Sequence, residues 1–142
     1  MKSKWIKYNN TIFMRKWNIT LFPFIFLVGK NDVDVINRIG QQRFKKLVNH
    51  ESIHRKQQKE VFILGVLLAA IVAITTSSLI LTILTHFIYY VIYILNYFIN
   101  IFKYKNNAYK NIAMEREAYS NSDNDNYLTE RKLFAWIKYI NK

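Results

Sequence analysis

The chain has 142 residues, enough for one small domain, and its 21 Lys and Arg against 9 Asp and Glu give a formal net charge of +12. The charge lies in the flanks, because residues 61–102 contain no Asp, Glu, Lys or Arg. The absence of cysteine excludes disulfides, thiol nucleophiles and Cys-ligated metal sites. The three glycines are not clustered, which excludes a glycine-rich phosphate-binding loop.

The first part of the chain contains short apolar and aromatic runs that predict strands. The runs 5–8 and 12–14 flank two asparagines, which tolerate left-handed turns, so we expect a hairpin there. The ten-residue run 19–28 is too short to cross a bilayer as a helix. Because Pro23 cannot donate a ladder hydrogen bond, this run is expected to form an edge strand.

Helix signals follow this run. Asn31, Asp32 and Asp34 provide side chains that can cap a helix. Beyond Gly40, residues at helical spacing continue into the apolar segment, and their shared face comprises Phe44, Leu47, Val48, Glu51 and His54. The helix is therefore expected to enter a membrane without a break.

The uncharged segment 61–102 predicts membrane insertion. As a single helix it would be about 63 Å long, twice the ~30 Å hydrocarbon core of a bilayer. We therefore expect a two-span transmembrane helical hairpin that reverses within residues 75–78 or near Thr82, where hydroxyl side chains can bond the backbone. Basic residues flank both ends, so the positive-inside rule predicts that both termini are cytoplasmic, in a bacterial inner membrane or its equivalent.

The last part of the chain alternates helical and turn signals. Residues 111–120 are expected to form a helix, and the polar stretch 120–126 a turn. Residues 129–140 predict an amphipathic helix with Thr129 as its N-cap and an apolar stripe of Leu133, Trp136, Ile137 and Ile140. The expected organisation is thus 1–60, 61–102 and 103–142, forming one functional domain.

The sequence His-Glu-Ser-Ile-His at residues 50–54 matches the pattern HExxH. Four positions apart on a helix, His50 and His54 share one face, so both imidazoles can bind a single zinc ion. Glu51 is then placed to accept a proton from metal-bound water. With three His and five Glu in the chain, one chance match has a probability of roughly 0.2%. The alternative is that these side chains form a solvated helix face.

A catalytic zinc ion usually has three protein ligands and one open position, so a third ligand is expected elsewhere. Glu115 and Glu117 are candidates, and because they are two positions apart on a helix only one of them can face the metal. His86 is the competitor, since an ionisable group in an apolar segment suggests function. The favoured alternative for His86 is a neutral imidazole hydrogen-bonded to Ser or Thr, too far into the span to reach His50.

The pattern HExxH, followed at a distance by Glu-x-x-Ala at residues 115–118, resembles the gluzincin metallopeptidases, particularly the CAAX-processing membrane type and the ImmA/IrrE type. The runs NHESIHRKQQKE and MEREAYSN around an apolar hairpin also resemble a group of small bacterial and phage membrane proteins, and this match covers nearly the whole chain. The resemblance implies that His50, His54 and Glu115 are the zinc ligands and that Glu51 is the general base. Tyr119 stands where the first two families have Asp or Asn, and it could donate to the oxyanion.

The resemblance implies a mainly α membrane protein with a minimal zincin-like α+β cytoplasmic part, which contains the active site. The expected function is a membrane-bound, zinc-dependent metalloendopeptidase acting on a peptide or membrane-protein substrate. The substrate is expected along the run 19–28, and the alternative is that this run is a core strand without substrate contact. One alternative is a non-catalytic, zinc-stapled membrane scaffold, and another is a membrane-permeabilising hairpin. Nucleic-acid binding is not expected, since positive charge beside a membrane explains the same basic residues.

Overall fold

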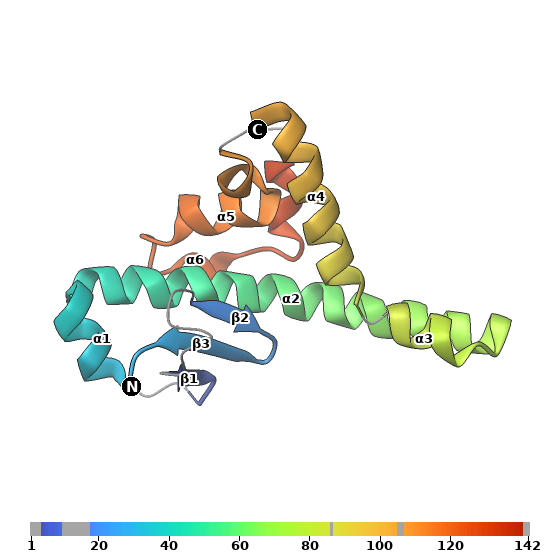
Figure 1. Cartoon of the computed structure of the whole chain (residues 1–142), viewed down its shortest axis with the longest axis horizontal. Helices are drawn as coiled ribbons and strands as arrows, with labels where there is room; N and C mark the ends of the chain where they lie inside the picture. The colour runs from blue at the N-terminus through green and yellow to red at the C-terminus, as the bar shows by residue number, and fades with distance from the viewer. Residues whose placement is uncertain (1–3, 10–17, 86, 105–106, 141–142) are drawn as a thin grey trace. The chain divides into compact units, whose positions relative to one another are not determined.

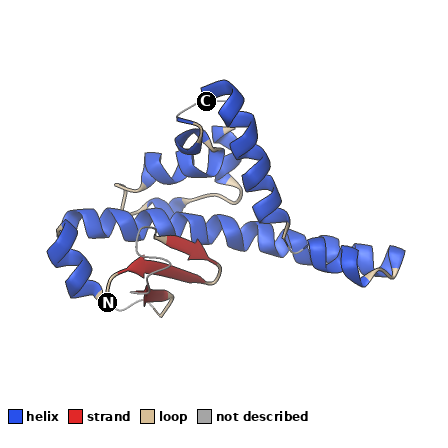
Figure 2. Cartoon of the chain, in the orientation of Figure 1, coloured by secondary structure: helices blue, strands red, loops and turns tan. Residues whose placement is uncertain are grey.

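The computed structural model of the chain describes residues 4–9, 18–85, 87–104 and 107–140. These residues are mainly helical and include a three-stranded sheet (Figure 1 and Figure 2). Contacts divide the chain into a first unit, Met1–Lys56 with Ala118–Arg131, and a second unit, Gln57–Glu117 with Lys132–Lys142. The helices α2 (Gln41–Thr76) and α5 (Ala113–Asn121) each continue from one unit into the other.

The sheet of the first unit has the strand order β1-β3-β2, and its strands are β1 (Ile6–Asn9), β2 (Ile19–Leu21) and β3 (Phe24–Val28). The prediction of one edge strand over residues 19–28 was wrong, because the chain turns at Phe22 and Pro23 and returns as the central strand β3. Pro23 has no N–H to donate, and the turn places it outside the hydrogen-bonded ladder. Only β2 is an edge strand in this part of the run.

β3 pairs in parallel with β1, with Ile6 opposite Ile25, and antiparallel with β2, with Ile19 opposite Phe26. The predicted hairpin partner of β1, the run 12–14, lies outside the described residues. Alternate side chains of β3 point to one face, and on that face Ile25 and Leu27 are buried. Figure 1 shows the sheet beside the part of α2 that belongs to the same unit.

The predicted helix start is confirmed in α1 (Asp32–Ile39). The side chain of its N-cap Asn31 accepts a hydrogen bond of 2.9 Å from the Asp34 N–H. Gly40 ends α1 with φ +86°, a conformation that glycine adopts without the steric cost of a Cβ atom. α2 then runs for 36 residues through HExxH and into the apolar segment, as the sequence predicted.

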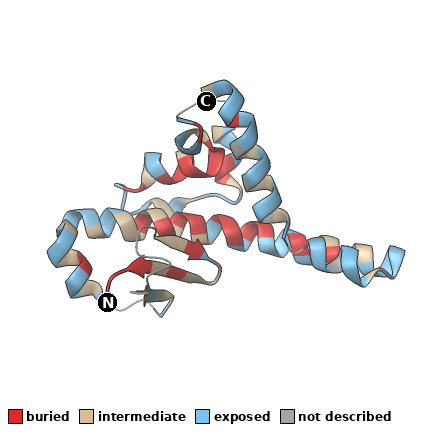
Figure 3. Cartoon of the chain, in the orientation of Figure 1, coloured by how far each residue is buried: buried red, intermediate tan, exposed pale blue. Residues whose placement is uncertain are grey.

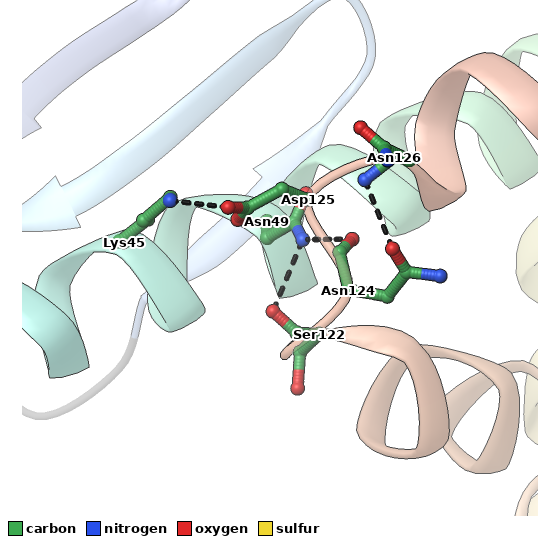
Figure 4. A network of polar contacts seen from close by, with 6 residues as sticks. All are labelled: Lys45, Asn49, Ser122, Asn124, Asp125 and Asn126. Carbon is green, nitrogen blue, oxygen red and sulfur yellow. Dashed lines mark hydrogen bonds and ion pairs between the residues drawn. The ribbon is translucent and has the colours of Figure 1, made fainter.

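A polar turn of the first unit, residues 122–126, is held against α2 (Figure 4). The Asn49 side-chain amide donates to the backbone oxygens of Ser122 and Asn124, at 3.0 and 2.9 Å. Lys45 forms an exposed ion pair with Asp125. Because the turn directly follows α5, these contacts fix the last residues of α5 beside the HExxH part of α2.

α2 is long and apolar enough to cross a membrane, judged by length and composition. Only 22% of its most apolar stretch is buried, which distinguishes it from the core helix of a soluble protein (Figure 3). α2 ends at Thr76, and Ser77 has φ +52°, so the helix breaks within the predicted region 75–78.

Two further helices complete the apolar segment, α3 (Leu79–Thr85) and α4 (Ile88–Tyr104). α3 and residues Tyr90–Tyr104 of α4 are apolar and long enough to cross a membrane only when taken together, and they are bent by 60°. The described residues therefore contain one such helix, or two if the bent pair counts as one span. The two-span hairpin remains a prediction.

The core of the second unit contains residues of α2, residues at the start of α5 and a tryptophan of the 3-10 helix η4 (Ala135–Tyr139). Its buried members are Val61, Ile112, Ala113, Met114 and Trp136. Ile88, Ile92 and Tyr93 of α4 pack against this cluster. A short 3-10 helix, η3 (Tyr109–Asn111), precedes α5, which confirms helical structure across most of the predicted stretch 111–120. One face of α4 is consequently covered by protein.

The prediction of one amphipathic helix over residues 129–140 was wrong. The structure has a four-residue helix, α6 (Tyr127–Glu130), and a 3-10 helix, η4 (Ala135–Tyr139), with Phe134 at φ +54° before η4. Thr129 lies inside α6 and is not its N-cap. Of the four residues of the predicted stripe, only Trp136 is buried. The packing of this one side chain therefore decides the local structure, and the helical spacing of the other three does not.

Candidate metal centre

His50 and His54 lie one turn apart on α2, in the first unit. Their Nε2 atoms are 3.1 Å apart, and the rings meet edge to face with centroids at 4.7 Å. Two nitrogen ligands bound tetrahedrally to one zinc ion at ~2.05 Å would be separated by ~3.3 Å. The imidazoles are therefore already at a spacing that suits a shared metal. His54 is buried and His50 is half-buried.

Glu51 is buried beside the edge strand of the sheet. Its Oε2 accepts a hydrogen bond of 2.7 Å from Oγ1 of Thr20, which is itself buried on β2. The same hydroxyl lies 3.1 Å from the Glu51 backbone oxygen. This contact orients the carboxylate expected to be the general base. Sequence reasoning missed Thr20, because the two residues are 31 positions apart and no local pattern joins a strand threonine to a helix glutamate.

Arg55 ties the HExxH turn of α2 to the turn between β2 and β3. Its Nε donates to the Pro23 backbone oxygen at 2.9 Å, and its guanidinium lies 4.3 Å from the centre of the Trp5 ring. Desolvation by partial burial lowers the pKa of the Arg55 guanidinium from its ordinary value, but the group stays protonated at neutral pH. A fixed positive charge therefore lies next to His54 in the chain.

Tyr119 of α5 borders the histidines. Its ring centroid is 4.7 Å from that of His50, with an angle of 60° between the ring planes, and 45% of the residue is exposed. The Tyr119 side chain is therefore accessible from solvent beside His50. This position is compatible with the predicted donation to an oxyanion.

The two candidate carboxylates of α5 have different surroundings in the second unit. Glu115 is 2% exposed, and its Oε1 accepts a hydrogen bond of 2.9 Å from the Tyr93 hydroxyl. Glu117 is fully buried, and its Oε2 accepts a hydrogen bond of 3.0 Å from the Gln57 amide. Gln57 also donates to the Met114 backbone oxygen at 2.9 Å, which holds α5 against α2 within this unit.

His50 and His54 of the first unit and Glu115 of the second unit form a group of side chains that could hold a metal ion. Glu115 and Tyr119 are four residues apart on α5, so the carboxylate lies on the same helix face as the tyrosine that borders His50. Two imidazoles and one carboxylate form a donor set that suits zinc and leaves a coordination position open. The residues thus fit the metal that the sequence predicted. His86, the competing ligand, lies outside the described residues.

Comparison of the chain with protein-family models, with curated proteins and with solved structures gave no match. Inference about function therefore depends on the chemistry of these side chains.

Proposed function

We propose that the protein is a membrane-bound, zinc-dependent metalloendopeptidase of the gluzincin kind, with His50, His54 and Glu115 as metal ligands and Glu51 as general base. The observation that carries the proposal is the pair of imidazoles with Nε2 atoms 3.1 Å apart beside a buried Glu on the same helical turn, with Glu115 as the third side chain of the group that could hold a metal. A zinc ion held there supplies a Lewis acid and lowers the pKa of a coordinated water towards 7.

Glu51 moves the proton in this proposal. The hydrogen bond from Thr20 engages Oε2, so Oε1 is the oxygen that accepts a proton from the attacking water. The same carboxyl group then returns the proton to the leaving amine, which completes peptide hydrolysis. Tyr119, which is partly exposed beside His50, donates its hydroxyl proton to the developing oxyanion as a hydrogen bond.

The substrate of the proposed enzyme is an extended peptide or an extended segment of a membrane protein. β2 is one of the two edge strands of the sheet and bears Thr20, the partner of Glu51. A peptide that pairs with this edge is held by main-chain hydrogen bonds along its length. The proposal limits the predicted substrate strand from residues 19–28 to the three residues of β2.

Membrane insertion belongs to the same proposal. Segment 61–102 is expected to form two spans, with both termini and the active site on the cytoplasmic side. Support comes from the apolar, mostly exposed second half of α2 and from the basic residues that flank the segment. In this proposal the flanking basic residues determine which side of the membrane the termini occupy. A nucleic-acid partner is not needed to explain the positive charge.

The proposal is tested by Glu51→Gln in the full chain, purified in detergent and loaded with zinc. An amide cannot accept the proton, so hydrolysis of a mixed peptide library, followed by mass spectrometry, should fall by at least about 100-fold while zinc content stays at one per chain. Conversion by the variant at the wild-type rate would refute the general-base role.

A zinc-stapled scaffold is the second candidate function. It is favoured by the burial of His54 and Glu115, which resembles the closed surroundings of a structural zinc ion. In a scaffold, Glu51→Gln would leave every function of the protein intact, whereas Glu115→Gln would abolish it. The two variants therefore separate the candidates.

A further inference from the structure

Helix α4 has a polar face although it comes from the apolar segment. Tyr93, Asn96 and Asn100 are spaced by three and four residues, so they form one stripe along the helix. Asn100 is buried, and the other two are half-buried. Other positions of the helix present exposed apolar side chains, among them Leu95, Phe98, Ile99 and Phe102. Lipid contact explains the apolar side chains but not the polar stripe.

Asn96 holds the start of α5. Its Oδ1 accepts a hydrogen bond of 3.2 Å from the N–H of Ala113, the first residue of α5. The Asn100 amide donates to the same Oδ1 at 3.0 Å and to the Asn96 backbone oxygen at 2.7 Å. The first N–H groups of a helix have no partner within the helix, so α4 satisfies one of them. α5 is thereby fixed at the end that carries Glu115.

Tyr93 supplies the second contact, and this one reaches the metal ligand itself. Its hydroxyl donates to Oε1 of Glu115 at 2.9 Å, only two residues into α5 from the Asn96 contact. A carboxylate with one oxygen held by an O–H group keeps a single orientation, and the lone pairs used for metal binding keep their direction. Partners of this kind change metal affinity typically by 10- to 100-fold.

We propose that Tyr93 is a positioning residue for the metal ligand Glu115. The apolar segment then contributes a side chain that orients a metal ligand, in addition to anchoring the protein in the membrane. The inference rests on the ligand set given under the proposed function. It goes beyond that function because it assigns a role in metal binding to a residue within the predicted membrane segment.

The test compares Tyr93→Phe with Tyr90→Phe in the full chain in detergent. Each variant loses one phenol hydroxyl from α4, and Tyr90 is 39% exposed. Zinc affinity is measured by competition with a chromophoric chelator. Tyr93→Phe should bind zinc about 10- to 100-fold more weakly than wild type, and Tyr90→Phe within about twofold of it. Equal affinity of the two variants would overturn the role of Tyr93.

Two further measurements separate positioning from folding. Co²⁺ in place of zinc should show a changed visible spectrum in Tyr93→Phe at unchanged helical content, whereas loss of helix together with metal would overturn the proposal. In a Glu115→Gln background, Tyr93→Phe should cause no additional loss of affinity, because the hydroxyl acts through that carboxylate. A wild-type chain that binds no zinc refutes the proposed function itself, so the two failures are distinguishable.

Discussion

α2 is one uninterrupted helix, yet its HExxH half buries polar side chains and its apolar half leaves large apolar side chains exposed (Figure 3). In the HExxH half, Glu51, His54 and Gln57 are all less than a tenth exposed. In the apolar half, Leu67 is 59% exposed and Ile74 is 83% exposed. The difference cannot come from helix formation, because the backbone hydrogen bonds continue through both halves.

Each half of α2 therefore needs a different partner. Burying a charged or polar group costs free energy unless hydrogen bonds or a metal compensate, and the buried residues of the first half have such contacts in Thr20 and Glu117. A long exposed apolar surface is unfavourable in water and favourable in lipid. A metal therefore suits the first half, and a bilayer suits the second.

Removing one of the proposed metal ligands should cause the greatest change, a loss of zinc. Glu115→Gln should reduce zinc from one per chain towards none, as His54→Ala should, because a three-ligand site that loses one ligand has an incomplete shell. Glu117→Gln is the matched control, since its carboxylate accepts from Gln57 and an amide oxygen can accept the same bond. Metal analysis after gel filtration measures all three variants.

The opposite result would reassign the ligand. If Glu117→Gln loses zinc and Glu115→Gln retains it, the preference for Glu115 is wrong and the predicted alternative, Glu117, is the third ligand. Retention of zinc by His54→Ala would remove the HExxH site altogether.

A charge introduced into the apolar half of α2 should weaken its insertion into a membrane. Leu67→Arg places a charge near the middle of the exposed apolar stretch, where membrane insertion should become less favourable by about 2.5 to 3.5 kcal/mol. Leu133→Arg is the control, because Leu133 is 78% exposed outside that segment. The fraction of protein that resists alkaline extraction from membranes should fall for Leu67→Arg alone. Equal fractions for both variants would contradict a span through residue 67.

Local signals in the sequence predicted several of these features. The HExxH spacing, the Asn31 cap and the uninterrupted helix into the apolar segment each depend on residues within a few positions of one another. Those interactions join residues that are close in the sequence, so local sequence patterns can predict them. The choice of Glu115 as third ligand comes from a family resemblance, whereas helical spacing alone left Glu117 open.

The remaining features depend on contacts between distant parts of the chain. Thr20 meets Glu51 across 31 positions, and Tyr93 meets Glu115 across 22. The expected C-terminal helix is divided because Trp136 packs into a core that periodicity does not reveal. The run 19–28 has strand propensity on both sides of Pro23, but the pairing of its two halves depends on the turn at that residue. Propensity and periodicity carry no information about such partners.

Removing the single hydrogen bond between Thr20 and Glu51 should cause a smaller change, a fall in the rate of hydrolysis. Thr20→Val keeps the shape of the side chain but removes the hydroxyl that holds Oε2 of Glu51 at 2.7 Å. A hydrogen bond to a charged group contributes about 1.5 to 3 kcal/mol, so kcat should fall by at least about tenfold while zinc content and KM stay near wild type. Thr20→Ser restores the hydroxyl without the methyl group and should recover most of the rate. If serine is as slow as valine, the methyl group packs the site and the hydroxyl does not orient Glu51. If valine is as fast as wild type, Glu51 is oriented by its helix alone, and the edge strand contributes nothing to proton transfer.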